Sequence, residues 1–220
     1  MTIAEVSEAS GLARRLRDAT AAAHRSASRG GLNDRIMSGT ITVEEYTAML
    51  GQLWHVYHVL ELATDVLGDD PVAAQFVDRR LDRAPLLEAD LDALGMDRSR
   101  PPAPLPETEP YLDRLASVAA TDPVAFVAHH YTRYLGDLSG GQYMGRRVEE
   151  HLDLGPESGT GWYHFEAISD PDAYKAEYRA RLDRVELGDV GERRLVEEVL
   201  VAYELNQRML DGIDRLGRGA

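Results

Sequence analysis

Three glycines interrupt a stretch that otherwise has a helical pattern, and they are the first sign of chemistry in this chain. Gly136, Gly140 and Gly141 fall within six residues. An interior glycine costs a helix about 1 kcal/mol relative to alanine, so three together need a reason. Gly136 and Gly140 share one helical face, and Arg133 and Asp137 flank it. Bare backbone edged by ionisable groups suits a flat ligand; the alternative is a close contact between two helices.

His24 is the best candidate for a metal ligand. On a helix it shares a face with Arg17, Thr20 and Ala21, so small side chains surround the imidazole. Arg17 lies about 10 Å earlier along the axis at roughly 1.5 Å per residue. That separation suits an iron ligand and a cation that meets the propionates of a macrocycle. The alternative is a hydrogen-bonded histidine near a helix end.

The sequence excludes several other kinds of site. No histidine follows a glutamate by three residues, so the Glu-x-x-His motifs of di-iron bundles are absent. His-Glu-x-x-His is also absent, and no glycine-rich loop follows a strand. Without cysteine there are no disulfides, thiolate ligands or cysteine nucleophiles. Iron held by one imidazole remains, and the other histidines are interpreted as packing or surface residues: His55, His58, His129, His130, His151 and His164.

A second group of polar residues follows in the last third of the chain. Lys175, Tyr178 and Arg179 are three and four residues apart and fall on one helical face. Two cations and a phenol would suit a pair of carboxylates, because arginine can bind a carboxylate through two hydrogen bonds. The alternative is a solvated face that pairs with Glu177 or Asp183.

The pattern of apolar residues predicts an all-α fold. Leu12, Leu16, Ala19 and Ala23 form one stripe, and no alternating strand pattern of useful length appears. We expect helices over residues 10–28, 42–67 with a Thr42–Glu45 capping box, 72–94 with a kink or break at Pro85, 110–120, 123–153, 171–187 and 190–216. Residues 100–106 should form an extended surface connection and residues 155–161 a loop. The prediction is a single-domain bundle of about seven or eight helices over residues 1–220, with its core at about 10–215.

Composition and charge limit the location and the partners. The 220 residues are 44% hydrophobic and 28% charged, which is ordinary for a globular protein. No apolar run reaches the roughly 20 residues of a membrane span, and the N-terminus lacks the pattern of a secretory signal. We therefore expect a cytoplasmic protein without a membrane anchor. The formal net charge of −14 disfavours nucleic acid and anionic membranes as partners.

The charge is unevenly distributed. Between residues 14 and 29 there are five arginines against one acid, Asp18, a local charge of +4. The segment is either a solvated helix face or a docking surface for an acidic partner. Its arginines are Arg14, Arg15, Arg17, Arg25 and Arg29.

Several motifs together resemble the haem oxygenase family. The stretch Tyr131–Gln142 is similar to the family's distal-helix signature, and Leu16–His24 resembles its proximal-helix motif. Trp54–Tyr57, Tyr174–Arg179 and Tyr203–Asn206 also match in order and approximate spacing. The similarity covers about residues 10 to 215, and the distal motif is highly specific.

The resemblance implies a site in which haem b lies between a proximal and a distal helix. His24 would be the iron ligand, with the distal backbone approaching haem at Gly136 and Gly140. Asp137 would organise a distal water network with Arg133, and the propionates would be held by Arg17, Tyr131, Lys175 and Arg179. Two positions depart from the family pattern: Ala21 replaces a frequent basic residue, and Ser28 a frequent acid beside the proximal histidine.

The activity that the resemblance implies is oxidative opening of haem by O2 and external electrons. The products would be biliverdin, CO and ferrous iron, with haem as both substrate and cofactor and with cleavage at the α-meso carbon. An acidic donor such as ferredoxin, or a reductase, would supply the electrons. Two alternatives stay open: a non-catalytic haem-binding carrier or sensor, and a haem-free helical enzyme of the thiaminase type, which normally needs a cysteine.

Overall fold

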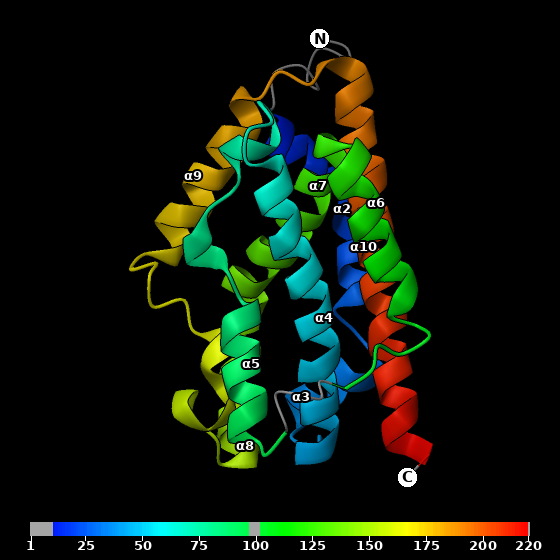
Figure 1. The fold of residues 1–220 in the computed structure, drawn as a ribbon, viewed down its shortest axis with the longest axis vertical. Coiled ribbons are helices and arrows are strands. Elements are labelled where there is room, and N and C mark those ends of the chain that lie inside the picture. The colour runs from blue at the N-terminus through cyan, green and yellow to red at the C-terminus, as the bar shows by residue number, and fades with distance from the viewer. Residues whose placement is uncertain (1–10, 97–101, 220) are drawn as a thin grey trace.

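The computed structural model describes residues 11–96 and 102–219, and these ranges are helical and without strands (Figure 1). Their α-helices are α2 (Leu12–Ala27), α3 (Gly31–Ser38), α4 (Val43–Leu67), α5 (Ala84–Ala93), α6 (Glu109–Thr121), α7 (Pro123–His130), α8 (Gln142–Leu152), α9 (Pro171–Arg184) and α10 (Gly188–Gly219). Short 3-10 turns are η1 (Ala73–Gln75), η2 (Arg79–Leu81) and η6 (Gly161–Tyr163), and π-helical segments are η3 (Tyr131–Leu135), η4 (Asp137–Gly141) and η5 (Pro156–Thr160). The all-α prediction is confirmed.

The long helices α4 and α10 provide the framework around which the shorter helices pack (Figure 1). The predicted capping box starts α4: the Thr42 hydroxyl accepts from the Glu45 amide at 3.2 Å, and the Glu45 carboxylate accepts from the Thr42 amide at 2.9 Å. Behind this start, α4 buries Tyr46, Leu50 and Leu60 completely. Helix α10 packs against α2, α4 and α7. Among the described residues, no helix combines the length and apolar character needed to cross a membrane.

Of the two outcomes expected at Pro85, a kink or a break in the helix over residues 72–94, the structure has a break, with Pro85 in the first turn of α5. The prediction of a helix before the break is wrong, because the chain forms only the 3-10 turns η1 and η2 there. The reason is a contact distant in sequence. The buried Glu61 carboxylate of α4 accepts from the Ala84 amide at 3.0 Å, so it supplies the cap that α5 lacks locally.

A short helix, α3, was not predicted. It is eight residues long, and Gly30 and Gly31 before and at its start both have positive φ. It is stabilised from outside: Leu32 and Ile36 are buried, and Arg35 pairs with Glu45 of α4 and with Asp214 of α10.

Two further expectations need correction or restriction. The stripe on α2 is Leu12, Ala13, Leu16 and Thr20, while Ala19 is exposed. The proline-rich connection is described only from Pro102 onward, because residues 100 and 101 lie outside the described ranges. Its described part lies on α4, where the side-chain amide of Gln52 donates to the Ala103 carbonyl at 3.2 Å.

A buried carboxylate joins three helices. Glu198 of α10 is fully buried and accepts from Arg114 of α6 at 2.7 Å. It also pairs with His129 of α7 at 2.8 Å and with Arg194 at 2.9 Å. Burial raises the pKa of a carboxyl group, but Arg114 and His129 outweigh burial and lower the pKa of Glu198 to about 2. The ionised form therefore stabilises the fold.

Glu198→Gln should lower the free energy of unfolding at neutral pH by on the order of 3 kcal/mol, since one pKa unit corresponds to about 1.4 kcal/mol. The folded pKa of about 2 lies below the unfolded value of 4.5, so the contribution is complete above 4.5 and is lost as pH falls toward 2. Urea unfolding near pH 7 and near pH 3 should show a wild-type advantage that shrinks in acid. The exposed neighbour in Glu197→Gln is the control. Equal advantages at both pH values would contradict the prediction.

Candidate functional site

The glycine-rich stretch lies where the helical path from α7 to α8 widens. The predicted helix over 123–153 has nearly the predicted extent, but η3 and η4 replace α-helical bonding in its middle. Such π segments are rare and occur frequently at functional sites. Gly136, between them, has φ −61° and ψ −50°, which any residue adopts in a helix. Backbone conformation therefore does not explain glycine here.

Packing does not explain the presence of glycine at positions 136 and 140 either. A Cβ atom built on Gly136 or Gly140 would meet no described atom within 4 Å, and both residues are exposed. Gly145, in α8, is different, because its Cβ would lie 2.7 Å from the Tyr163 ring. Within the described structure, the alternative of a helix–helix contact thus applies to Gly145 and not to Gly136 or Gly140. These two leave an open strip of backbone.

The ionisable residues flanking this strip are held by a buried hydrogen-bond cluster. Arg133 donates to the Tyr57 hydroxyl from Nε at 3.1 Å and from Nη2 at 3.0 Å, and to Asn206 Oδ1 at 2.6 Å. The Tyr57 hydroxyl donates in turn to Asp137. Arg133 and Asp137 also form an ion pair of 3.5 Å. Helices α4 and α10 therefore hold both predicted distal residues in place.

Burial changes the proton affinities in this cluster. It raises the pKa of Asp137, although Arg133 and the Tyr57 hydroxyl partly offset the increase. Burial also raises the pKa of Tyr57 well above its usual value, so the phenol stays neutral. For Arg133 burial acts to lower the pKa, but Tyr57 and Asp137 outweigh it, so its pKa is raised and it stays charged. The result is a fixed cation beside a carboxyl group with increased proton affinity.

Tyr57 and Asn206 are also candidate functional residues, although the sequence predicted no role for them. Tyr57 ends the motif Trp54–Tyr57 and Asn206 ends the motif Tyr203–Asn206, so the two motifs indicated these positions without indicating their function. Their contacts to Arg133 join residues more than 70 positions apart, which residue spacing cannot reveal.

His24 lies exposed on α2, in its last turn. Its ring meets the ring of Tyr203, from α10, edge to face with centroids 5.8 Å apart. The Ser28 hydroxyl donates to the His24 carbonyl at 2.8 Å instead of to the imidazole. Within the described residues the imidazole has no hydrogen bond or ion pair, so its nitrogens are available for a ligand.

Three of the four predicted propionate-binding residues influence one another electrostatically. Burial raises the pKa of Tyr131, and the positive charges of Arg179 and Arg17 act to lower it. Arg17 and Arg179 are exposed. The fourth residue, Lys175, has partners of its own. Its ammonium group forms an ion pair of 2.9 Å with Asp172 and donates a hydrogen bond of 3.3 Å to the Leu138 carbonyl in η4. The lysine therefore contacts the distal segment directly.

The interpretation of Tyr178 as part of this cationic face is wrong. Tyr178 is fully buried and hydrogen-bonds His130 at 2.9 Å. Its helical face turns inward because α9 packs Tyr174, Tyr178 and Leu182 into the core. His130 is also buried, and burial lowers the pKa of His130 to about 3. The prediction that His129 and His130 are packing residues is confirmed.

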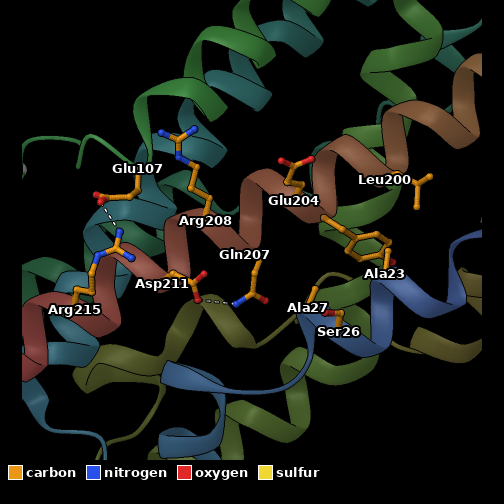
Figure 2. Close-up of a pocket in the computed structure, with 11 residues that line it drawn as sticks. Ala23, Ser26, Ala27, Glu107, Leu200, Glu204, Gln207, Arg208, Asp211 and Arg215 are labelled. Carbon is orange, nitrogen blue, oxygen red and sulfur yellow. Dashed lines mark hydrogen bonds and ion pairs between the residues drawn. The ribbon is translucent and has the colours of Figure 1, made fainter.

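The arginines between residues 14 and 29 have different environments in the structure. Arg15 forms an ion pair of 2.6 Å with Glu192 of α10, so its charge is paired within the fold. Arg25 and Arg29 are exposed, have no ion pair among the described residues, and line a hollow of about 510 Å³. A neighbouring groove of about 670 Å³ runs between α2 and α10 (Figure 2). Ser26 lines both hollows, so they adjoin at the end of the helix that carries His24.

Comparison with known proteins identifies the family. The family model described as "Heme oxygenase" matches residues 10–212. "Heme oxygenase 1" of Nostoc sp. is 32% identical over 206 residues, which cover 93% of this chain and 87% of that protein. The crystal structure of heme oxygenase-1 from the cyanobacterium Synechocystis sp. in complex with heme has a TM-score of 0.89 at 31% identity and covers 96% of each chain.

A second solved structure is similar in the same way. Heme oxygenase-2 from Synechocystis sp., in complex with heme and NO, has a TM-score of 0.90 at 30% identity, over 96% of this chain and 88% of that one. Sequence and fold thus agree over nearly the whole length, and this chain belongs to the haem oxygenase family.

Proposed function

We propose that this protein is a haem oxygenase, an enzyme that opens haem with O2 and external electrons to give biliverdin, CO and ferrous iron. Family membership supports the reaction class. The observation in this chain that carries the proposal is the open backbone at Gly136 and Gly140, which neither backbone conformation nor packing requires. Haem is the substrate, and when bound it supplies both the iron that meets O2 and the ring that is oxidised.

The residues present fit a haem. His24 offers an imidazole with both nitrogens free of described partners, and it would bind the iron. Arg17, Arg179 and Tyr131, whose charges and phenol influence one another electrostatically, would bind propionates together with Lys175, which shares α9 with Arg179. This clamp would set the rotation of the ring, so we propose cleavage at the α-meso carbon.

Asp137 is proposed to hold and deliver protons on the distal side. Its increased proton affinity supports this role, because a group that exchanges protons works best with a pKa closer to the working pH. The Tyr57 hydroxyl and Arg133 hold one side of its carboxyl group. Gly136 and Gly140 place backbone, and no competing side chain, over the ligand.

We further propose that an acidic protein such as ferredoxin delivers electrons at the hollow lined by Arg25 and Arg29. Two exposed arginines without described partners, at the end of the helix that carries His24, support this surface. A chain without cysteine needs no oxidising compartment for disulfide formation, and we propose the cytoplasm. A non-catalytic haem carrier is the alternative; it would bind haem through the same residues without consuming it.

Hemin titration followed by ascorbate in air tests the function, and the glycines provide the sharpest variants. The wild type should bind hemin and convert it to biliverdin. Gly136→Ala and Gly140→Ala should weaken hemin binding at least roughly tenfold, about 1.4 kcal/mol, since each adds a methyl group to the open strip. Neither should lower the melting temperature of the free protein, because alanine favours helix by about 1 kcal/mol.

Gly145→Ala is the matched control. It should destabilise the free protein, because its Cβ would lie 2.7 Å from Tyr163. Hemin that binds to the wild type but is not consumed would favour the carrier. Wild-type hemin affinity in both Gly136→Ala and Gly140→Ala would remove the observation on which the proposal rests.

Asp137→Ala should bind hemin but form biliverdin on the order of 100-fold more slowly, the typical effect of losing an acid–base group. Oxidation of an added phenol should appear instead, because protons would no longer be delivered from a fixed position. Absorbance spectra followed during turnover distinguish the products, and Asp69→Ala, at an exposed aspartate after α4, is the control. A biliverdin yield and rate equal to wild type would refute the role of Asp137.

Arg25→Glu with Arg29→Glu should raise the apparent KM for ferredoxin and flatten the salt dependence of ferredoxin-driven turnover. Attraction between exposed charges is screened beyond about 8–10 Å at physiological salt, so the wild type should slow as salt rises. Turnover driven by ascorbate should change little. Arg15 is not substituted in this variant, because it forms an ion pair with Glu192.

A charge-matched control for this variant is Arg184→Glu with Arg193→Glu. Arg193 follows Glu192, which contacts Arg15 near the start of α2, whereas Arg25 and Arg29 are at the other end of that helix. If the control impairs ferredoxin-driven turnover as much as the test variant, only net charge matters and the proposed docking surface is incorrect.

A further inference from the structure

Among the described residues, no protein group accepts the hydrogen bond that usually orients a metal-binding histidine from the imidazole of His24. A metal-bound histidine almost always donates its second ring nitrogen to a carboxylate, a carbonyl or water, which fixes the plane of the ring. Among the described residues, no side chain or carbonyl accepts from His24. Ser28 lies at i+4, the position from which a helical side chain reaches the ring. Its hydroxyl is committed to the His24 carbonyl at 2.8 Å.

The contact that the His24 ring does make is aromatic. The ring of Tyr203 lies 5.8 Å from it, centroid to centroid, at an interplanar angle of 76°. This is the edge-to-face arrangement that aromatic pairs prefer, because the positive edge of one ring meets the negative face of the other. An imidazole that rotated about its Cβ–Cγ bond would lose this geometry.

Tyr203 is itself fixed in position. It stands on α10, which packs against α2 along their shared length, and it is half-buried. Burial raises the pKa of Tyr203 to about 12, with a further contribution from Tyr131, so the phenol stays neutral. The ring also lines the groove between α2 and α10, where the small residues Ala23 and Ala27 leave it room.

We propose that Tyr203 is a positioning residue that sets the plane of the His24 imidazole by an aromatic edge contact, in place of a hydrogen bond from the ring to a protein side chain or carbonyl. The inference rests on the proposed function, since it concerns His24 as the ligand of haem iron. Tyr203 acts through His24 and need not touch the reacting atoms. The orientation of this imidazole should therefore depend on packing against Tyr203.

The test compares Tyr203→Leu with Tyr203→Phe in the haem-loaded protein. Resonance Raman spectra of the ferrous form should show one narrow iron–histidine band in the wild type and in Tyr203→Phe, which keeps the aromatic ring. In Tyr203→Leu the band should broaden or shift, and haem should dissociate about two- to tenfold faster, as expected for one lost aromatic contact. Leu200→Ala, one turn earlier on α10 and in the same groove, is the control and should match wild type.

A second variant tests the proposal independently of packing. Adding Ser28→Glu to Tyr203→Leu supplies a carboxylate acceptor at i+4, and it should restore a narrow band at a position that reflects a more basic imidazole. Melting temperatures of the free proteins show that each variant is folded.

The outcomes separate this inference from the function. If His24→Ala keeps the wild-type haem spectrum, His24 is not the ligand and the function as proposed fails. If His24→Ala loses the band while Tyr203→Leu keeps wild-type band and dissociation rate, only the role of Tyr203 is overturned. Tyr203→Phe behaving like Tyr203→Leu would overturn it as well, because the hydroxyl group and not the ring would then be responsible.

Discussion

The compensation of one buried charge is the constraint on which the rest of the site depends. A guanidinium group in the core must be paired and hydrogen-bonded, because an isolated buried charge is very costly. Arg133 meets this requirement with groups from three separate elements: Tyr57 of α4, Asp137 of η4 and Asn206 of α10. The requirement therefore joins the two longest helices to the distal segment. The widened turns of η3 and η4 are tolerated because this cluster anchors them.

Tyrosines connect the proposed proximal and distal sides of the site electrostatically. Tyr131, where η3 begins, is influenced by the positive charges of Arg179 of α9 and Arg17 of α2. It also contributes to the increased pKa of Tyr203, whose ring contacts His24. The polar cluster around Arg133 is buried and hydrogen-bonded, whereas Arg17 and Arg179 of this second set are exposed. The proposed site thus combines a buried distal cluster with exposed cations.

Local patterns predicted what local interactions control. The all-α fold, the start of α4 at Thr42 and the extent of the helix that holds the glycines follow from spacing and capping within a few residues. The 3-10 turns before α5 did not follow, and neither did the cap of α5, because that cap is Glu61, 23 positions away. Candidate residues followed the same division. Arg133 and Asp137 were recognised from one helical face, but Tyr57 and Asn206 were given no role, since their partner is more than 70 residues away.

The open backbone at Gly136 and Gly140 also limits how this chain can evolve. Glycine is the smallest residue, so every substitution at either position adds atoms to a surface whose proposed use, close approach of haem, depends on having none. Selection cannot tune such a surface by small steps at the positions themselves, as it can where a side chain makes the contact. Variation in how the ligand is held must instead come from the surrounding residues, such as Lys175, which contacts the Leu138 carbonyl from α9. We therefore expect the residues around Gly136 and Gly140 to vary more in sequence than these two glycines.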